Sequence, residues 1–445
     1  MTLPRAARPA IALAFLVTLL FPGRADADGV VPQAVEIPQQ LTLDQSIQIL
    51  RTRSLDVLIA EAAVRSAEGD ETAASAVPNL ALSLGYGRVL PPYSVSGCSG
   101  CSANQYTIGL ADQAAIEDSL SGKRDLRIKV AHAALQAAKL SRNDALRNIQ
   151  FQVKSAYAAV AQAQRGLAFA KENQATNVKT LQLFQIRLKS GAINEGDLAR
   201  VETQKLEADQ AVEQAMVTVR QARVALAFLL GVRGPTPEFT VDDKVLDFAV
   251  PPSLATAQLD GLLRSAFEHR PDLQAQGYQR SSAEAAIALA KRQVFPDITV
   301  SAQYTQTGEG NAAIQPPTLS FGLSAPIPIF YQQQGEIRKA EAAYDTQSLQ
   351  QAKTTAQVVN DVSTAMAGYE STRALVERME KLLKPSAERA FSITRLQYDK
   401  GAATLMDFLD AQRTYIATNV EYLQDLANYW TAVFQVEQAV GTELH

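Results

Sequence analysis

The sequence is poor in the residue types that build metal and catalytic sites. Its 445 residues include two cysteines, three histidines and one tryptophan. The histidines His132, His269 and His445 are far apart, and no nucleophile-elbow, zinc-protease or phosphate-loop motif occurs. In an exported chain Cys98 and Cys101 could close a small disulfide or remain loop thiols, and a metal site would need further ligands. We therefore expect no enzyme activity, no cofactor and no bound metal.

The sequence also lacks a large excess of positive or negative charge. Lys and Arg number 42 and Asp and Glu number 46, for a net charge of −4, and no basic stripe occurs. Binding to nucleic acid is therefore not expected. After residue 27 no apolar run approaches the roughly 18 residues of a membrane-spanning helix. If this chain enters a membrane, it must do so as a β-barrel.

Residues 1–27 have the pattern of a cleaved signal peptide. Arg5 and Arg8 precede a short apolar run, Ile11–Phe21, and the small-residue site Ala25-Asp26-Ala27 follows. A signal anchor is the alternative, but the apolar run is short for a membrane span. The sequence therefore predicts an exported protein.

One pattern occurs twice along the chain. A Gly-Ala turn that ends in Asp occupies 191–197 and again 401–407, each time between two Ala-rich helical patterns. We interpret the chain as a tandem duplication in which each unit has a short helix, a strand pair and a long helical hairpin. The predicted boundaries are a first repeat at 28–231, a linker at 232–256 and a second repeat at 257–445.

Two segments, about 79–114 and 297–325, alternate between apolar and small or polar residues. Each predicts a pair of strands. One apolar face and one polar face are typical of strands between lipid and water, although an edge hairpin of a soluble sheet is the alternative. Because the smallest barrels have about eight strands, other copies must complete this one, and three copies of four strands would supply twelve.

The remaining sequence predicts long helices. Residues 118–189 contain no proline, and contact positions at Ile149, Val153, Ala156 and Val160 step by four and three. Long helices joined by tight turns suggest a tube or bundle.

Other helical patterns are shorter or interrupted. They run from Thr42 or Asp44 to about Ala76, over 198–230, over 332–400 with an interruption at Pro385, and onward from Phe408. Irregular structure is expected at Ile37–Leu50, in the linker and around Pro385.

A signal peptide, two strand pairs and two long hairpins in tandem resemble the TolC-like outer-membrane efflux channels. The resemblance spans nearly all of the chain after residue 27. Its motifs are His269–Leu273, Val294–Ile298 and Tyr398–Arg413. Two further segments, Gly122-Lys123-Arg124 and Pro326–Phe330, resemble the heavy-metal branch of that family.

The resemblance implies a mainly α fold with a membrane β-barrel. The assembly would be a homotrimer whose long antiparallel helices form a periplasmic α-barrel and whose twelve-stranded barrel, four strands per chain, lies in outer-membrane lipid. The location would be the bacterial outer membrane, with a long periplasmic extension. The implied partners are a periplasmic membrane-fusion adaptor and an inner-membrane pump of the RND type.

The resemblance also assigns roles at the two turns. The residues that would dock the adaptor are Gly191, Ala192, Asn194, Glu195, Gly401, Ala402, Thr404 and Leu405. The two glycines suit left-handed positions at helix ends.

A gate would lie beside them. Tyr398 and Asp197 match residues that hold the tunnel closed through a hydrogen bond, and Asp407 and Asp410 match acids that line the aperture. The alternative is that Asp197 and Asp407 only cap their helices. Ala403 stands where the family prototype has a basic closure residue, so part of that lock is missing or replaced.

The expected function is a passive exit duct, with heavy-metal cations as substrates. The alternatives are a duct for drugs or solvents, type I secretion and, from another class, a periplasmic coiled-coil scaffold.

Overall fold

The computed structural model describes residues 36–88, 104–307 and 316–444. The predicted signal peptide lies outside these ranges, as do Cys98, Cys101 and His445. The chain divides into two compact units, Met1–Glu36 and Ile37–His445. Only Glu36 of the first unit is described, so every helix and strand below belongs to the second.

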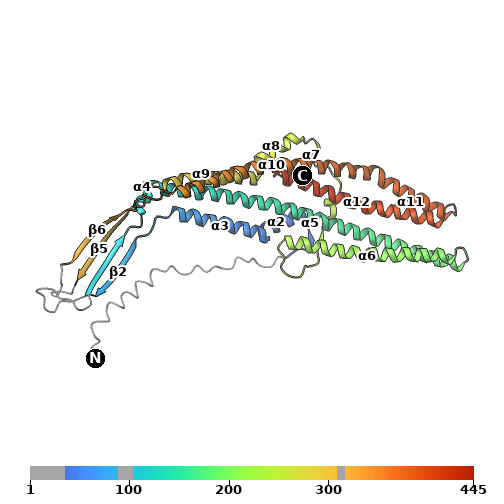
Figure 1. Ribbon diagram of the computed structural model, residues 1–445. Coiled ribbons are helices and arrows are strands. Elements are labelled where there is room, and N and C mark those ends of the chain that lie inside the picture. Colours follow the sequence, from blue (N-terminus) through green and yellow to red (C-terminus); the bar gives the residue numbers. More distant parts are fainter. Residues whose placement is uncertain (1–35, 89–103, 308–315, 445) are drawn as a thin grey trace, which may run out of the picture. The chain divides into compact units, whose positions relative to one another are not determined.

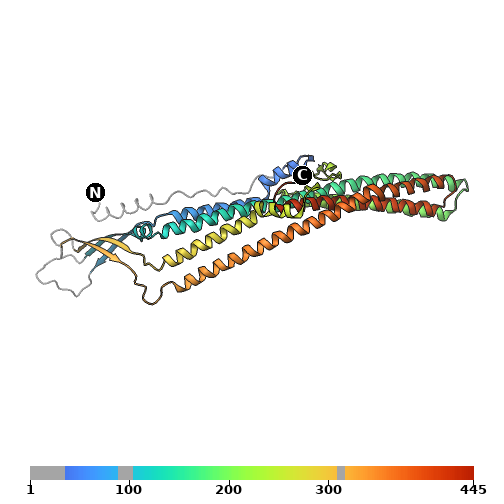
Figure 2. The same ribbon diagram turned by 90° about the horizontal axis from the view of Figure 1, so that it is seen from above.

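Two series of elements follow the same order along the chain, except that a short helix, Ala115–Ser121, occurs in the first series alone. The first is α2 (Leu43–Arg53), α3 (Leu55–Ser75), β2 (Ala81–Arg88), β3 (Asn104–Ala111), α4 (Ala115–Ser121), α5 (Lys123–Lys189) and α6 (Glu195–Leu229). The second is α8 (Leu259–His269), α9 (Pro271–Arg292), β5 (Thr299–Thr307), β6 (Thr318–Ser324), α10 (Gln334–Arg378), the π turn η4 (Met379–Leu383), α11 (Lys384–Asp399) and α12 (Leu405–Val440). Figures 1 and 2 show the long strands at one end of this unit and the turns after α5 and α11 at the other. The mainly α fold predicted from the sequence is confirmed.

The helix predicted from Thr42 to Ala76 is divided in two. The chain bends at Ser54, which is extended (φ −61°, ψ 131°) and 1% exposed. Gly231, at the end of α6, lies against this bend: a Cβ there would come within 2.5 Å of the Arg53 carbonyl oxygen. The bend is therefore packed against a residue far along the chain, which the local sequence pattern cannot report.

Three segments that were expected to be irregular contain regular structure. Ile37–Leu50 includes β1 (Gln40–Leu41) and the start of α2, which opens with a capping box at Thr42. The segment 232–256 includes β4 (Thr240–Val241), the short helix η2 (Asp243–Leu246) and α7 (Pro252–Ala255). At Pro385 the helix continues, because the π turn η4 widens it just before the proline, which falls in the first turn of α11.

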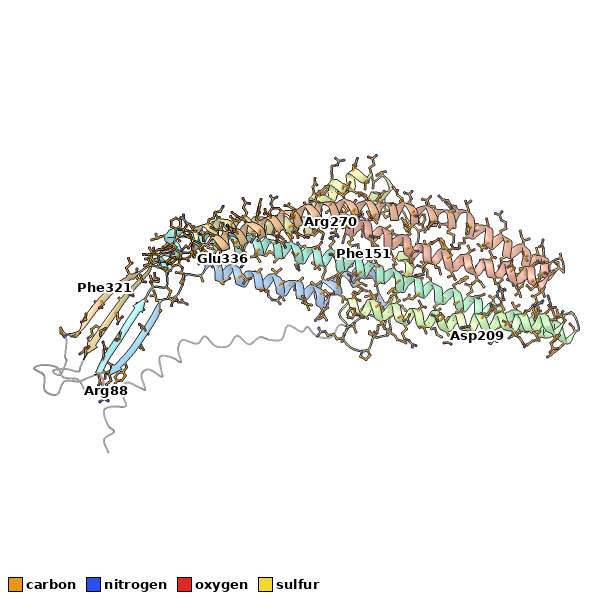
Figure 3. The ribbon with its side chains drawn as sticks, in the orientation of Figure 1. Arg88, Phe151, Asp209, Arg270, Phe321 and Glu336 are labelled. Atoms are coloured by element: carbon orange, nitrogen blue, oxygen red, sulfur yellow. The ribbon has the colours of Figure 1, made fainter. Side chains whose placement is uncertain are left out.

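The long strands form one antiparallel sheet in the order β2-β3-β5-β6. One row across the sheet joins Leu82, Leu110, Ala302 and Phe321, and a second row on the same face joins Leu84, Ile108, Tyr304 and Leu319. The row between them points to the opposite face and joins Ser83, Gly109, Gln303 and Ser320. The apolar face is open, with Phe321 77% exposed (Figure 3). The predicted alternation is therefore present across all four strands.

The main hydrophobic core joins helices of both series to the short parallel pair β1–β4. Ile149, Val153 and Val160 of the predicted seam are buried in it, Ala156 is partly buried against it, and Tyr157 of α5 is buried beside them. The Tyr157 hydroxyl donates to the Leu41 carbonyl oxygen (2.9 Å) and accepts from the Asp242 amide (2.9 Å), so it ties α5 to both strands. Among the described helices, none combines the length and hydropathy needed to cross a bilayer.

Candidate functional site at the hairpin tips

The two hairpin turns have the same backbone. We call residues 190–197, between α5 and α6, the first tip, and residues 400–407, between α11 and α12, the second tip. Gly191 (φ 74°) and Gly401 (φ 75°) are left-handed, which confirms the expectation for both. Their amides donate to carbonyl oxygens three residues earlier, and the next residues, Ala192 and Ala402, donate five residues back. This is the Schellman arrangement, which uses glycine because it has no Cβ to clash.

The residues that cap the returning helices are Asn194 and Thr404. The Asn194 side-chain oxygen accepts from the Asp197 amide (2.9 Å), and the Thr404 hydroxyl accepts from the Asp407 amide (3.2 Å). The Asp407 carboxylate in turn accepts from the Thr404 amide and hydroxyl, and these bonds lower its pKa. Capping therefore engages Asp407 through its carboxylate, whereas the Asp197 carboxylate pairs with Arg200 at 3.4 Å.

The hydrogen bond expected between Tyr398 and Asp197 is not formed. The Tyr398 hydroxyl instead accepts from Arg187 (3.3 Å), near the end of α5. The Arg187 guanidinium carbon lies 5.4 Å from the Tyr398 ring centre and 5.9 Å from that of Phe184, and the guanidinium is 4.0 Å from the Asp399 carboxylate. The long arginine side chain lets one guanidinium donate to the Tyr398 hydroxyl and lie beside the Tyr398 and Phe184 rings at once. Arg187 therefore takes the place that was expected for the Asp197 carboxylate.

Arg187 is the functional candidate that the sequence analysis missed. It lies four residues before Gly191, and its counterpart before Gly401 is Gln397. The sequence could have pointed to Arg187, because a cation one turn before the tip glycine occurs at this position in only one of the two repeats. Burial raises the pKa of the Tyr398 phenol, Arg187 acts against that rise, and Asp197 adds to it. Asp197 therefore influences Tyr398 through its charge, without a direct bond.

A small apolar core joins the two tips. Its buried members are Phe184, Val201, Leu405, Phe408 and Leu409. Tyr398 stacks on Phe184 (5.9 Å between ring centres, 5° between planes) and on Phe408 (5.4 Å, 22°). Leu405 was expected to face the adaptor, but it is only 8% exposed, because it is the first residue of α12 and packs into this core.

A cavity of about 470 Å³ opens between the tips. The predicted residues that line it are Ala192, Asp197, Tyr398, Gly401, Thr404 and Leu405. Ala403 lines it too, together with Arg187 and Arg200, so positive charge absent at Ala403 comes from α5 and α6. Gly191, Asn194, Glu195, Ala402, Asp407 and Asp410 are exposed and do not line this cavity.

Metal ligands do not gather at the tips. Within residues 36–88, 104–307 and 316–444, no group of three or more His, Cys, Asp or Glu side chains is placed to hold a metal ion. The chemistry of the site is that of a cation beside two stacked aromatic rings, next to two capped helix ends.

Known proteins share this sequence pattern and fold. The profile of the outer membrane efflux protein family matches residues 46–232 and 262–442. The cobalt-zinc-cadmium resistance protein CzcC of Cupriavidus metallidurans is 24% identical over 326 residues, which cover 72% of this chain and 74% of CzcC. The pyoverdine export outer membrane protein OpmQ of Pseudomonas aeruginosa is 26% identical over 417 residues, 89% of this chain and 84% of OpmQ.

A solved structure shares the fold. The Campylobacter jejuni CmeC outer membrane channel superposes with a TM-score of 0.75 at 15% identity, over 90% of this chain and 85% of CmeC. Proteins of the matched family are outer-membrane channel components of tripartite efflux systems, which work with periplasmic adaptors and inner-membrane pumps and are not enzymes. Because the family profile matches both halves of the sequence, this chain belongs to the outer membrane efflux protein family.

Proposed function

We propose that this channel is the exit duct of a system that exports heavy-metal cations. The similarity to CzcC over 72% of the chain supports this substrate class, as do the Gly122-Lys123-Arg124 and Pro326–Phe330 segments. The competing candidate is a duct for organic compounds, which the similarity to OpmQ favours.

The assembly we propose is a homotrimer with a twelve-stranded barrel in outer-membrane lipid. The observation that carries it is the open apolar face of the four-stranded sheet, where Leu82 is 59%, Phe321 77% and Leu323 76% exposed. Apolar side chains on one face and small or polar ones on the other suit a wall between lipid and a water-filled interior. Because sheet edges are not tolerated in lipid, β2 and β6 would pair with neighbouring copies.

The helices of the three copies would form the periplasmic tunnel, which ends at the tips. The exposed tip residues Gly191, Ala192, Asn194, Glu195, Gly401, Ala402 and Thr404 would meet the adaptor. Neither tip glycine has an atom within 4 Å of its Cβ position, so a partner backbone has room to approach. Asp407 and Asp410 would ring the aperture with carboxylates that favour cations.

A susceptibility panel on a deletion strain tests the substrate. Cobalt, zinc, cadmium, nickel and copper salts are compared with dyes, detergents, solvents and antibiotics, and a plasmid copy provides the complementation control. Sensitivity confined to metals is the expected result. Sensitivity to organic compounds alone would keep the duct and reject the cation assignment.

Membrane extraction separates the duct from a periplasmic scaffold. A barrel trimer should need detergent for release, because its apolar sheet face lies in lipid. Release by salt or alkali alone would reject the barrel.

A further inference from the structure

A polar layer lies between the tip core and the main core, and ring contacts from Phe408 through Phe391 and Tyr415 to Phe169 run past it. Asn173 and Asn177 of α5 face Gln412 of α12 there, and the Gln412 amide donates to the Asn177 side-chain oxygen at 3.3 Å. Gln412 is 2% exposed, and its own side-chain oxygen has no partner among the described residues. An unpaired buried amide oxygen costs free energy, so this layer is a weak point in the packing between the two hairpins.

The second hairpin also has a break in its helix. The π turn η4 separates α10 from α11, whereas α5 runs without interruption through 67 residues. A π turn disturbs the regular hydrogen-bond ladder and is a natural place for a helix to flex. The second tip is thus the one better able to move.

Arg187 forms a polar bridge from the first tip to the second. It belongs to α5, and its contacts to Tyr398 and Asp399 both reach α11. The Arg187 side chain is 29% exposed, so its cation–π contacts with Phe184 and Tyr398 are partly shielded from water. The Asp197 carboxylate pairs within its own helix with Arg200, and within the described part of the chain it forms no ion pair with the second hairpin.

We propose that Arg187 is a positioning residue that keeps the tunnel mouth narrow by holding Tyr398, and with it the second tip, against the first hairpin. The inference rests on the proposed duct. It assigns to Arg187 the closing role expected of the basic residue that Ala403 replaces. Loss of this cation would free the end of α11 to swing about η4 and widen the aperture.

Single-channel recording in planar lipid bilayers tests this role in the full-length protein. Arg187→Gln should raise the open-to-closed ratio about tenfold, because a shielded cation–π contact and its hydrogen bond are lost together. Arg187→Lys should raise this ratio much less than Arg187→Gln does, since lysine keeps a positive charge over the rings. Tyr398→Phe keeps the stack and loses only the hydrogen bond, so its effect should lie between wild type and Arg187→Gln.

Two controls separate Arg187 from its neighbours. Arg200→Gln removes an exposed arginine of the same tip, and Asp197→Asn removes the carboxylate first expected to bond Tyr398. Each should change the ratio less than about threefold, because an ion pair with a solvent-exposed arginine, formed within one helix, contributes little. An Asp197→Asn channel as open as Arg187→Gln would overturn the proposal, as would an Arg187→Gln channel that gates like wild type.

A distance measurement tests the clamp without relying on conduction. Spin labels at Lys189→Cys and Lys400→Cys, in a chain with Cys98→Ser and Cys101→Ser and diluted with unlabelled chains, report on the tips of one protomer. Arg187→Gln should broaden the distance distribution and Arg200→Gln should not. Equal distributions would reject the clamp. Wild-type protein that never conducts would instead count against the duct, and the spin-label result would still decide the clamp.

Discussion

Ser54 and Arg270 occupy the same bend in the two halves of the molecule. Ser54 (φ −61°, ψ 131°) separates α2 from α3, and Arg270 (φ −68°, ψ 118°) separates α8 from α9. Both are buried, and both lie against a left-handed glycine that ends a long helix, Gly231 in the first half and Gly441 in the second. The two halves therefore share a backbone solution for joining a short helix pair to the end of a hairpin.

The side chains at this bend differ in chemistry. Arg270 donates to Asp272 (2.6 and 3.0 Å), to Asp361 (3.0 Å) and to the Ala439 carbonyl oxygen (3.3 Å), so its charge is bonded on several sides (Figure 3 labels Arg270). Ser54 brings no charge to the corresponding place. The repeated feature is therefore the path of the main chain, and each half stabilises that path with its own contacts.

The largest expected effect comes from removing the charge in the second half alone. Arg270→Met should lower the free energy of unfolding by about 3 kcal/mol, because Asp272 and Asp361 lose their buried partner. Ser54→Ala, the matched change, should cost no more than about 1 kcal/mol. Denaturant unfolding of the detergent-solubilised protein, followed by circular dichroism, measures both. Equal losses would mean that the ion cluster adds nothing to the shared backbone.

Replacing the glycines at the two bends by alanine should also cost different amounts of stability. Alanine at either position must adopt a left-handed conformation, which costs about 1–2 kcal/mol. In Gly231→Ala the new Cβ would lie 2.5 Å from the Arg53 carbonyl oxygen, whereas in Gly441→Ala it would lie 3.4 Å from the nearest atoms of Arg270. Gly231→Ala should therefore lower the free energy of unfolding by about 1–3 kcal/mol more than Gly441→Ala does, since main-chain atoms must shift to admit its Cβ. The same unfolding experiment ranks the pair, and a larger loss at Gly441 would contradict the prediction.

Acid should weaken the second half at the Arg270 cluster. Burial acts to raise the pKa of Asp272, but the hydrogen bonds and charge of Arg270 outweigh it and lower the pKa. A lowered carboxyl pKa stabilises the folded state above the ordinary value of about 3.9, and that stabilisation is lost as the pH falls through the folded pKa. The stability difference between wild type and Arg270→Met should therefore shrink below about pH 4.

Unfolding midpoints measured from neutral to acidic pH check this expectation. Ser54→Ala serves as the control, because its difference from wild type should not change with pH. An Arg270→Met difference that stays constant on acidification would show that Asp272 does not carry the effect.

The smallest expected change in stability comes from replacing two left-handed residues by glycine, and it should be the same in both halves. Ala114, before α4, and Gln333, before α10, are the described non-glycine residues with positive φ, at 63° and 60°. Replacing either by glycine removes left-handed strain, partly offset by the greater freedom of glycine in the unfolded chain. Ala114→Gly and Gln333→Gly should each stabilise by up to about 1 kcal/mol. A clear gain at only one site would show that the strand-to-helix junctions are not equivalent.

Features set by nearest neighbours could be predicted from the sequence. Gly191 and Gly401 were expected to be left-handed because a helix that stops within a few residues needs such a position. The strands followed from alternation with period two, and the α5 seam from steps of four and three. In each case the residues that set the local structure lie close together in the sequence.

Features set by contacts between distant residues could not be predicted. Ser54 bends the chain where Gly231 packs against it, and Arg187 reaches Tyr398 across 211 residues of sequence. Tyr398 was recognised as a tip residue, but its partner depended on which long side chain the folded hairpins bring beside it.

Most of the long helices, the four long strands and both tip turns follow from the local sequence, because propensity, periodicity and turn chemistry act over short stretches of chain. Long-range packing, in contrast, brings Arg187 rather than Asp197 to the Tyr398 hydroxyl, buries Leu405 and places Arg270 within an ion cluster. Hydrogen bonds, ring contacts and ion pairs depend on spatial separation, and for residues far apart in sequence that separation is set by folding alone.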